Sequence, residues 1–197
     1  MGAGYVSKLR VMLIDDNTER IAMMERTLIA EGHTVVARLD TPAELSPAVR
    51  EHQPDILFIT VDAPGRETLD ALEGLNREQP RPVVLFAARS DVDTTRRAVQ
   101  AGVSAYVVDG LHPARLRPLL EVAIARFELH QALRRELNQA RIRLADHRDI
   151  EKAKGLLMKR RSVDEAAAYG LLRRMAMDRK QRIGDFARAL LTAADVL

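Results

Sequence analysis

Cysteine is absent from all 197 residues of this chain, and so is any long hydrophobic run. Without cysteine there is no disulfide, no thiol nucleophile and no thiolate metal site, and the chain suits a reducing cytoplasm. No apolar run approaches the roughly 18 residues that a membrane span needs. The opening residues, MGAGYVSKLR, contain no apolar export segment, and Val6 stands where a myristoylation signal needs serine or threonine. The sequence therefore predicts a cytoplasmic protein without a membrane anchor.

Basic and acidic residues are unevenly distributed along the chain. Residues 148–197 contain 12 lysines and arginines against 7 aspartates and glutamates, whereas residues 1–147 contain 19 against 21. The C-terminal part thus carries a formal charge of +5 and the remainder −2. A basic unit of this kind indicates a polyanionic partner, although a charge of this size is also common on an ordinary solvated surface.

Five short runs of strand-forming residues alternate with helical patterns in the first part of the chain. Near-continuous apolar strands separated by helices are typical of a parallel sheet that is covered on both faces. Five such βα units predict an α/β, flavodoxin-like fold, in which ligands bind at the carboxyl ends of the strands. The runs are RVMLID (10–15), TVVARL (34–39), DILFITV (55–61), PVVLFAA (82–88) and AYVVD (105–109).

Helix boundaries are signalled by short motifs between these runs. In TPAE, Thr41 is placed to cap a helix and Pro42 to begin it, and in SDVD, Ser90 and Asp93 predict a capping box. Gly32 and Gly102 stand where helices should stop.

Glycine and proline are missing between Leu119 and Gly155, which predicts a long helix. Within it, Leu133, Leu137, Ala140 and Leu144 recur at spacings of four, three and four, as the a and d positions of a short coiled coil do. The alternative is a connecting helix that packs against its own domains. Arginines and a glutamate on the other faces favour a two-stranded coiled coil, and therefore a homodimer, although His147 weakens the seam at one d position.

Three helices are predicted at the C-terminus, because apolar residues recur there at helical spacing. SVDE predicts a capping box of Ser162 and Glu165 for the second helix, and DRKQ predicts one of Asp178 and Gln181 for the third. The apolar stripes are Ile150, Ala153 and Leu157; Ala168, Leu172 and Met175; and Ile183, Phe186 and Leu190.

Two adjacent carboxylates, Asp15 and Asp16, follow the first predicted strand. Such a pair persists where a hard cation such as Mg²⁺ neutralises it, or where the loop is well solvated. The pair, the strand and turn PDILFITVDAPG, and AGVSAYVVDGL together resemble the receiver domain of bacterial response regulators over roughly residues 8–125.

The resemblance breaks down at the residues that would carry phosphorylation. In that family an aspartate closes the third strand as phosphoacceptor, at the position of Thr60 here; a hydroxyl residue ends the fourth strand, at Ala87, and a lysine ends the fifth, at Asp109. Thr60 is a poor nucleophile without an adjacent base, and Asp109 puts negative charge where a phosphoryl group needs a cation. Asp62 lies two residues on and would share a strand face with Thr60, but its place near the APG turn favours a turn or metal-proximal carboxylate.

The stretches RDIEKAKGLLMKRR and DEAAAYGLLRRMAMDRKQRI resemble the ANTAR domain, the three-helix RNA-binding module of bacterial transcription antiterminators, over about residues 144–190. The whole chain is similar to the nitrate-assimilation antiterminators and, more distantly, to the amidase-operon regulator. The resemblance implies that the protein binds stem-loops in a leader transcript. It also implies control by a ligand-sensing protein partner in place of phosphorylation.

Residue spacing in the C-terminal unit is compatible with RNA binding. Gly155 leaves a bare helix surface between Lys152 and Lys159, where a phosphate backbone can approach, although a glycine there also suits close helix packing. Tyr169 and Arg173 form an i, i+4 pair off the apolar stripe, suited to stacking an unpaired base, although a tyrosine at a helix junction is common.

The resulting hypothesis is a receiver-like domain (1–125), a coiled-coil linker helix (126–147) and an ANTAR RNA-binding domain (148–197). No catalytic constellation is visible, and no cofactor is required, with Mg²⁺ at Asp15 and Asp16 as an option. Alternatives of a different class are a protein-interaction module that binds an acidic partner and a DNA-binding regulator. The residues expected to contact RNA are Lys152, Lys154, Gly155, Lys159, Tyr169, Arg173 and Arg174, and those expected at the dimer seam are Leu133, Leu137 and Leu144.

Overall fold

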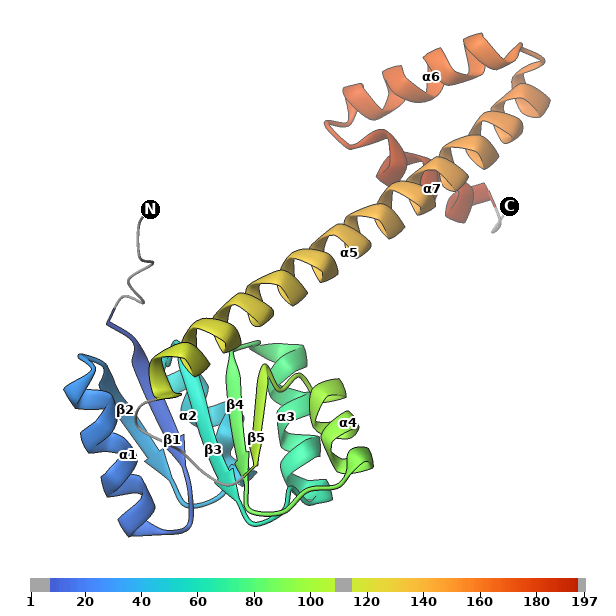
Figure 1. The fold of residues 1–197 in the computed structure, drawn as a ribbon. Helices are drawn as coiled ribbons and strands as arrows, with labels where there is room; N and C mark the ends of the chain where they lie inside the picture. Colours follow the sequence, from blue (N-terminus) through green and yellow to red (C-terminus); the bar gives the residue numbers. More distant parts are fainter. Residues whose placement is uncertain (1–7, 109–114, 195–197) are drawn as a thin grey trace. The chain divides into compact units, whose positions relative to one another are not determined.

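The computed structural model describes residues 8–108 and 115–194 and divides into two compact units, Met1–His130 and Gln131–Leu197 (Figure 1). The two domain boundaries predicted at 125/126 and 147/148 both fall inside one continuous helix, so no break in secondary structure marks them. Over the described ranges, the helices include none that is long and apolar enough to cross a bilayer.

A five-stranded parallel sheet forms the centre of the first unit, with the strand order β2-β1-β3-β4-β5. The predicted flavodoxin-like architecture is therefore confirmed, and the described strand ends lie within one residue of those predicted. The apolar runs follow from burial on both faces, since Val11, Phe58 and Val84 have no exposed surface. The strands are β1 (Arg10–Ile14), β2 (Thr34–Leu39), β3 (Ile56–Val61), β4 (Val83–Ala87) and β5 (Ala105–Val108).

Helices cover the two faces of this sheet in separate groups (Figure 1). One face packs on α1 (Thr18–Ala30) and on the first turns of α5 (Leu116–Arg161), through buried residues such as Leu28 and Leu120. The other face packs on α2 (Leu45–His52), α3 (Arg66–Glu78) and α4 (Val92–Gln100), with a short 3-10 turn, η1 (Pro42–Glu44), before α2. Two hydrophobic layers, one on each face, therefore hold the carboxyl ends of the strands in place.

The predicted helix signals of this unit are confirmed at three positions and wrong at one. Thr41 caps η1, accepting a hydrogen bond from the Ala43 N–H, and Gly32 and Gly102 adopt φ values of +87° and +101° directly after their helices. The predicted Ser90 box is shifted by one residue, because Asp91 is the N-cap of α4. Its carboxylate accepts the Thr94 N–H at 2.7 Å, and this hydrogen bond lowers the pKa of Asp91.

The second unit is a three-helix bundle formed by the C-terminal part of α5, α6 (Glu165–Asp178) and α7 (Ile183–Ala194), as predicted (Figure 1). All three predicted stripes contribute to one core, whose buried members are Ala153, Leu157, Ala168, Leu172, Ala176, Phe186 and Ala187.

Both predicted capping boxes of the bundle are wrong. Asp164 caps α6 by accepting the Ala167 N–H at 2.8 Å, while Ser162 takes a left-handed conformation in the turn that ends α5. Asp178 is the last residue of α6, and the first turn of α7 closes on the carbonyl of Arg182. At α6 the polar residue nearest the helix competes better for its N–H groups than the one that the motif selects.

A network of ion pairs fastens α7 to α5. The Asp146 carboxylate, 15% exposed, pairs with Arg182 at 3.0 Å and with Arg188 at 3.2 Å, and Arg188 also reaches Asp149 at 2.9 Å. Gly184 lets this carboxylate approach the start of α7, because a Cβ there would lie 2.4 Å from the Asp146 Cγ. Asp146 cannot turn aside without loosening both arginine contacts.

Gly184→Ala should lower the free energy of unfolding of the bundle by about 1–3 kcal/mol, the usual cost of inserting a methyl group into a packed site. Gly170→Ala is the matched control, because a Cβ at Gly170 would meet no atom within 4 Å. Alanine should there be neutral or add up to about 1 kcal/mol through helix propensity. Urea unfolding followed by circular dichroism measures both, and equal stabilities of the two variants would contradict the role of Gly184.

Candidate functional sites in the receiver and the bundle

The carboxyl ends of β1, β3 and β4 bring the predicted receiver residues to one edge of the sheet. Asp15 and Asp16 directly follow β1, Thr60 is the last but one residue of β3, and Ala87 ends β4. Asp62 lies just beyond the end of β3 and is exposed, and its backbone carbonyl accepts the Arg89 N–H at 2.9 Å. The remaining predicted member, Asp109, lies outside the described residues.

Arg20, which the sequence analysis did not single out, provides the positive charge at this edge. Its guanidinium donates from Nη2 to Asp15 Oδ1 at 2.8 Å and from Nε to Asp15 Oδ2 at 2.9 Å, and it reaches Asp16 Oδ1 at 3.0 Å. The hydrogen bonds to Asp15 raise the pKa of Arg20, burial opposes the rise, and Asp16 and Asp62 add to it. The i, i+4 spacing from Asp16 was the one sequence signal of this arrangement.

The hydroxyl group of Thr60 has no activating partner in the described part of the chain. Its Oγ1 is buried without a hydrogen bond there, and Ala87, opposite Val61 on the neighbouring strand, brings no polar group. A threonine hydroxyl without a base within reach is a poor nucleophile. Among the described residues of this edge, Thr60 therefore lacks the activation that a phosphoacceptor needs, while Asp15 and Asp16 are paired with Arg20.

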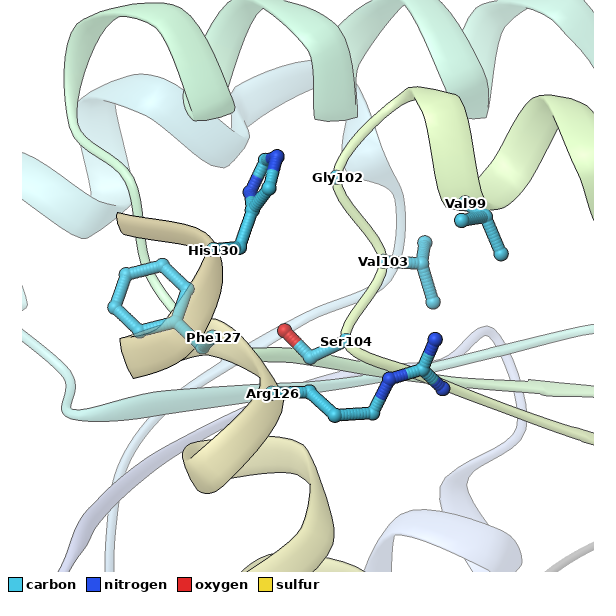
Figure 2. Close-up of a pocket in the computed structure, with 7 residues that line it drawn as sticks. All are labelled: Val99, Gly102, Val103, Ser104, Arg126, Phe127 and His130. Atoms are coloured by element: carbon cyan, nitrogen blue, oxygen red, sulfur yellow. The ribbon is translucent and has the colours of Figure 1, made fainter. Parts of the chain in front are cut away.

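A small pocket of about 150 Å³ lies at the opposite edge of the sheet, beside the residues that precede β5 (Figure 2). Its lining, labelled in Figure 2, comes from α5 (Arg126, Phe127 and His130) and from the end of α4 and the turn before β5 (Val99, Gly102, Val103 and Ser104). None of the predicted site residues lines this pocket. Binding sites for small molecules usually measure about 300–1,000 Å³, so the pocket is too small for an effector of ordinary size.

Lys154 is held by two carboxylates and does not project from the bundle. Its Nζ lies 2.8 Å from Glu151 and 2.6 Å from Glu165, and the residue is 8% exposed. These hydrogen bonds raise the pKa of Lys154, and the bond from Lys154 lowers the pKa of Glu151. The structure therefore gives Lys154 a contact that joins α5 to α6, and its charge is already balanced inside the bundle.

Gly155 sits between the two exposed lysines on the last turns of α5. A Cβ at Gly155 would meet no atom within 4 Å, so the packing of a neighbouring helix does not require glycine here. Lys152 and Lys159 are both exposed, as are Arg160 and Arg161, which close the helix. Cationic side chains thus flank a low helix surface that a large anion can approach.

The outer face of α6 combines an aromatic ring with positive charge. Tyr169 is 44% exposed and Met177 64% exposed, with Arg173 between them at helical spacing and Arg174 beside it, both also exposed. The sequence analysis did not select Met177. The face is therefore apolar enough for stacking and basic enough for phosphate contacts.

The predicted seam of α5 is exposed in the single chain. Leu133, Leu137 and Leu144 expose between 52% and 54% of their surface and belong to none of the three hydrophobic cores among the described residues. A row of leucines exposed at a and d positions is typical of a helix that packs against another helix.

Comparison with known proteins agrees with both units. Residues 11–121 match the response regulator receiver domain and residues 138–191 match the ANTAR domain. The transcriptional regulatory protein PdtaR of Mycobacterium tuberculosis is 30% identical over 182 residues, which cover 92% of this chain and 89% of that protein. Both domains are therefore shared with one relative over nearly its whole length.

Other relatives share a smaller part of the chain. A LuxR-family response regulator from Aurantimonas, known as a crystal structure, is 28% identical with a TM-score of 0.53, covering 60% of this chain and 86% of that one. A protein-glutamate methylesterase of Paraburkholderia xenovorans is 30% identical over 105 residues but is covered over 29% of its length, too little to extend its named activity to this chain. From the two domain matches and the relative that contains both, the chain belongs to the response regulators that join a receiver domain to an ANTAR domain, a family of transcriptional regulators.

Proposed function

We propose that this protein is a cytoplasmic transcription antitermination regulator whose C-terminal bundle binds hairpins in a leader transcript, so that a terminator hairpin cannot form. The main support is the exposed cationic surface around Gly155, where Lys152 and Lys159 flank a residue that carries no side chain. Each lysine that neutralises a phosphate releases condensed counterions, which favours binding and makes it dependent on salt.

Tyr169 and Arg173 supply the second part of this RNA contact. Hairpin loops present unstacked bases, and an exposed tyrosine ring next to a guanidinium on one helix face offers them a stacking surface. Duplex DNA offers no such bases, so we expect the bundle to prefer hairpin RNA to duplex DNA. We expect Arg174 to contact the phosphates that flank a stacked base.

Removing the two exposed lysines together, Lys152→Ala with Lys159→Ala, should weaken hairpin binding. The magnitude of the slope of log K against log salt concentration should fall by roughly 1.4–1.8, because each lost phosphate contact contributes about 0.7–0.9. Fluorescence anisotropy with a labelled hairpin at several salt concentrations measures both effects. The matched control is Arg66→Ala with Arg96→Ala, which removes two exposed charges from the receiver and should leave affinity and slope unchanged.

Lys154 serves as the internal comparison in the same assay. Lys154→Met should lower the urea midpoint of the bundle, because it leaves Glu151 and Glu165 without their cation. The protein that remains folded should bind the hairpin with the same dependence on salt concentration as the wild type. An unchanged affinity and slope in the Lys152 and Lys159 double variant, with its fold intact, would remove the basis of the RNA proposal.

The protein is also proposed to act as a homodimer joined along α5. Leu133, Leu137 and Leu144 form its seam, and pairing would bury these exposed side chains. A dimer presents two bundles to one transcript, so the second hairpin binds at a raised effective concentration. Two moderate hairpin contacts would then combine into tight binding.

Leu137→Glu with Leu144→Glu should convert the dimer into a monomer, because it places like charges opposite each other in the seam. Ile142→Glu is the control: Ile142 is 42% exposed on the same helix but lies two residues from the seam positions, so this variant should stay dimeric. Sedimentation equilibrium of the full chain at micromolar concentration measures the mass. A wild-type monomer under these conditions would contradict the proposed seam.

Control of the receiver is proposed to come from a ligand-sensing protein that holds the chain inactive until its ligand binds. The unactivated hydroxyl of Thr60, the apolar Ala87 and the paired aspartates support a receiver that docks a partner and carries out no phosphoryl chemistry. Such release requires the ligand to bind the free sensor more tightly than the sensor in the complex. No catalytic role is proposed for any residue of this chain.

A further inference from the structure

The bidentate ion pair between Arg20 and Asp15 occupies the place where receivers of this fold are expected to hold a divalent cation. Asp15 is 2% exposed, and both of its carboxylate oxygens accept hydrogen bonds from the guanidinium. Asp15 Oδ1 also accepts the Asn17 N–H at 2.8 Å. The buried carboxylate is thus neutralised and hydrogen-bonded by groups of the chain itself.

The position of Arg20 in the sequence fixes this contact. Asn17 caps α1 by accepting the N–H groups of Glu19 and Arg20, so Arg20 is the third residue of the helix and its side chain leaves the first turn beside Asp15. A cation in the first turn of a helix is opposed by the positive end of the helix dipole. The acidic pair is the local feature that compensates for it.

The described residues at this edge do not present the ligand set that a magnesium ion needs. Mg²⁺ requires oxygen ligands in nearly octahedral geometry, with carboxylates supplying the negative charge. The oxygens of Asp15 are engaged by Arg20, and Thr60 replaces the carboxylate expected at the end of β3. Among the described residues, no group of three or more acidic or histidine side chains is placed to hold a metal ion.

We propose that Arg20 is a built-in counter-ion that replaces the divalent cation and keeps the buried carboxylate of Asp15 permanently paired. The guanidinium supplies its positive charge at all times, whereas a metal ion binds and leaves with its concentration. The edge therefore has one electrostatic state, and a partner protein docks on a receiver whose surface charge does not depend on magnesium. This proposal concerns the receiver alone and does not depend on RNA binding by the bundle.

A set of full-length variants separates the effect of the Arg20 guanidinium on cation binding from the effect of the carboxylate that is missing at Thr60. Thr60→Asp restores an acid at the end of β3, and Arg20→Gln removes the internal cation while keeping a polar side chain. Arg38→Gln is the matched control, because Arg38 pairs with Glu25, a carboxylate of the same unit that is not part of the acidic pair. Isothermal titration with MgCl₂ measures cation binding in Thr60→Asp alone and combined with each arginine variant.

Thr60→Asp with Arg20→Gln should bind Mg²⁺ more than about tenfold more tightly than Thr60→Asp alone, since a positive charge within hydrogen-bond distance repels the ion. Thr60→Asp with Arg38→Gln should bind no better than Thr60→Asp alone. Equal affinities with and without Arg20, no binding by the Arg20 double variant, or a gain with the Arg38 change would each overturn the proposal.

Thermal unfolding in the native Thr60 background provides a second measurement that does not need the new acid. Arg20→Gln should lower the unfolding midpoint of the receiver more than Arg38→Gln does, because it leaves the buried Asp15 carboxylate without its partner. Millimolar MgCl₂ should recover part of that loss while leaving the wild type unchanged. An Arg20→Gln midpoint equal to that of Arg38→Gln would contradict the role of Arg20.

Discussion

The helix α5 is the constraint on which both units depend, because one continuous run of 46 residues supplies buried side chains to two hydrophobic cores. Leu116, Leu120 and Ala123 complete one face of the receiver sheet, and Ala153 and Leu157 lie in the core of the bundle. Because one helix must reach both cores, its sequence excludes glycine and proline along the stretch between them. The same uninterrupted stretch displays the exposed leucines that we assign to dimerisation.

Ion pairs within the chain determine which charged side chains are available to bind another molecule. Arg20 is engaged by two aspartates at the receiver edge, Lys154 by two glutamates, and Arg188 by Asp146 and Asp149. These cations stabilise the chain and are already balanced. The exposed lysines around Gly155 and the arginines of α6 have the solvent-facing placement that phosphate contacts need. The net charge of the C-terminal part alone does not distinguish these two groups.

The strands, the layers and the three-helix bundle were predictable because apolar periodicity reports burial, which sets the fold. The helix starts were less predictable: Asp91 and Asp164 displaced the caps inferred from Ser90 and Ser162, since several polar residues compete for the same N–H groups. The pairing of Arg20 with Asp15 and the burial of Lys154 were not predicted. Both depend on which side chains the folded chain brings together, and residue type and spacing say little about that.

The central claim is that the bundle binds RNA and that the receiver does not use a phosphoryl switch. Its most direct test is incubation of the full chain with acetyl phosphate and Mg²⁺, followed by intact mass measurement and hairpin binding on the same sample. The account predicts an unchanged mass, and hairpin binding of the same affinity before and after treatment. Stoichiometric addition of a phosphoryl group at Thr60 or Asp62, with a matching gain in hairpin affinity, would contradict it.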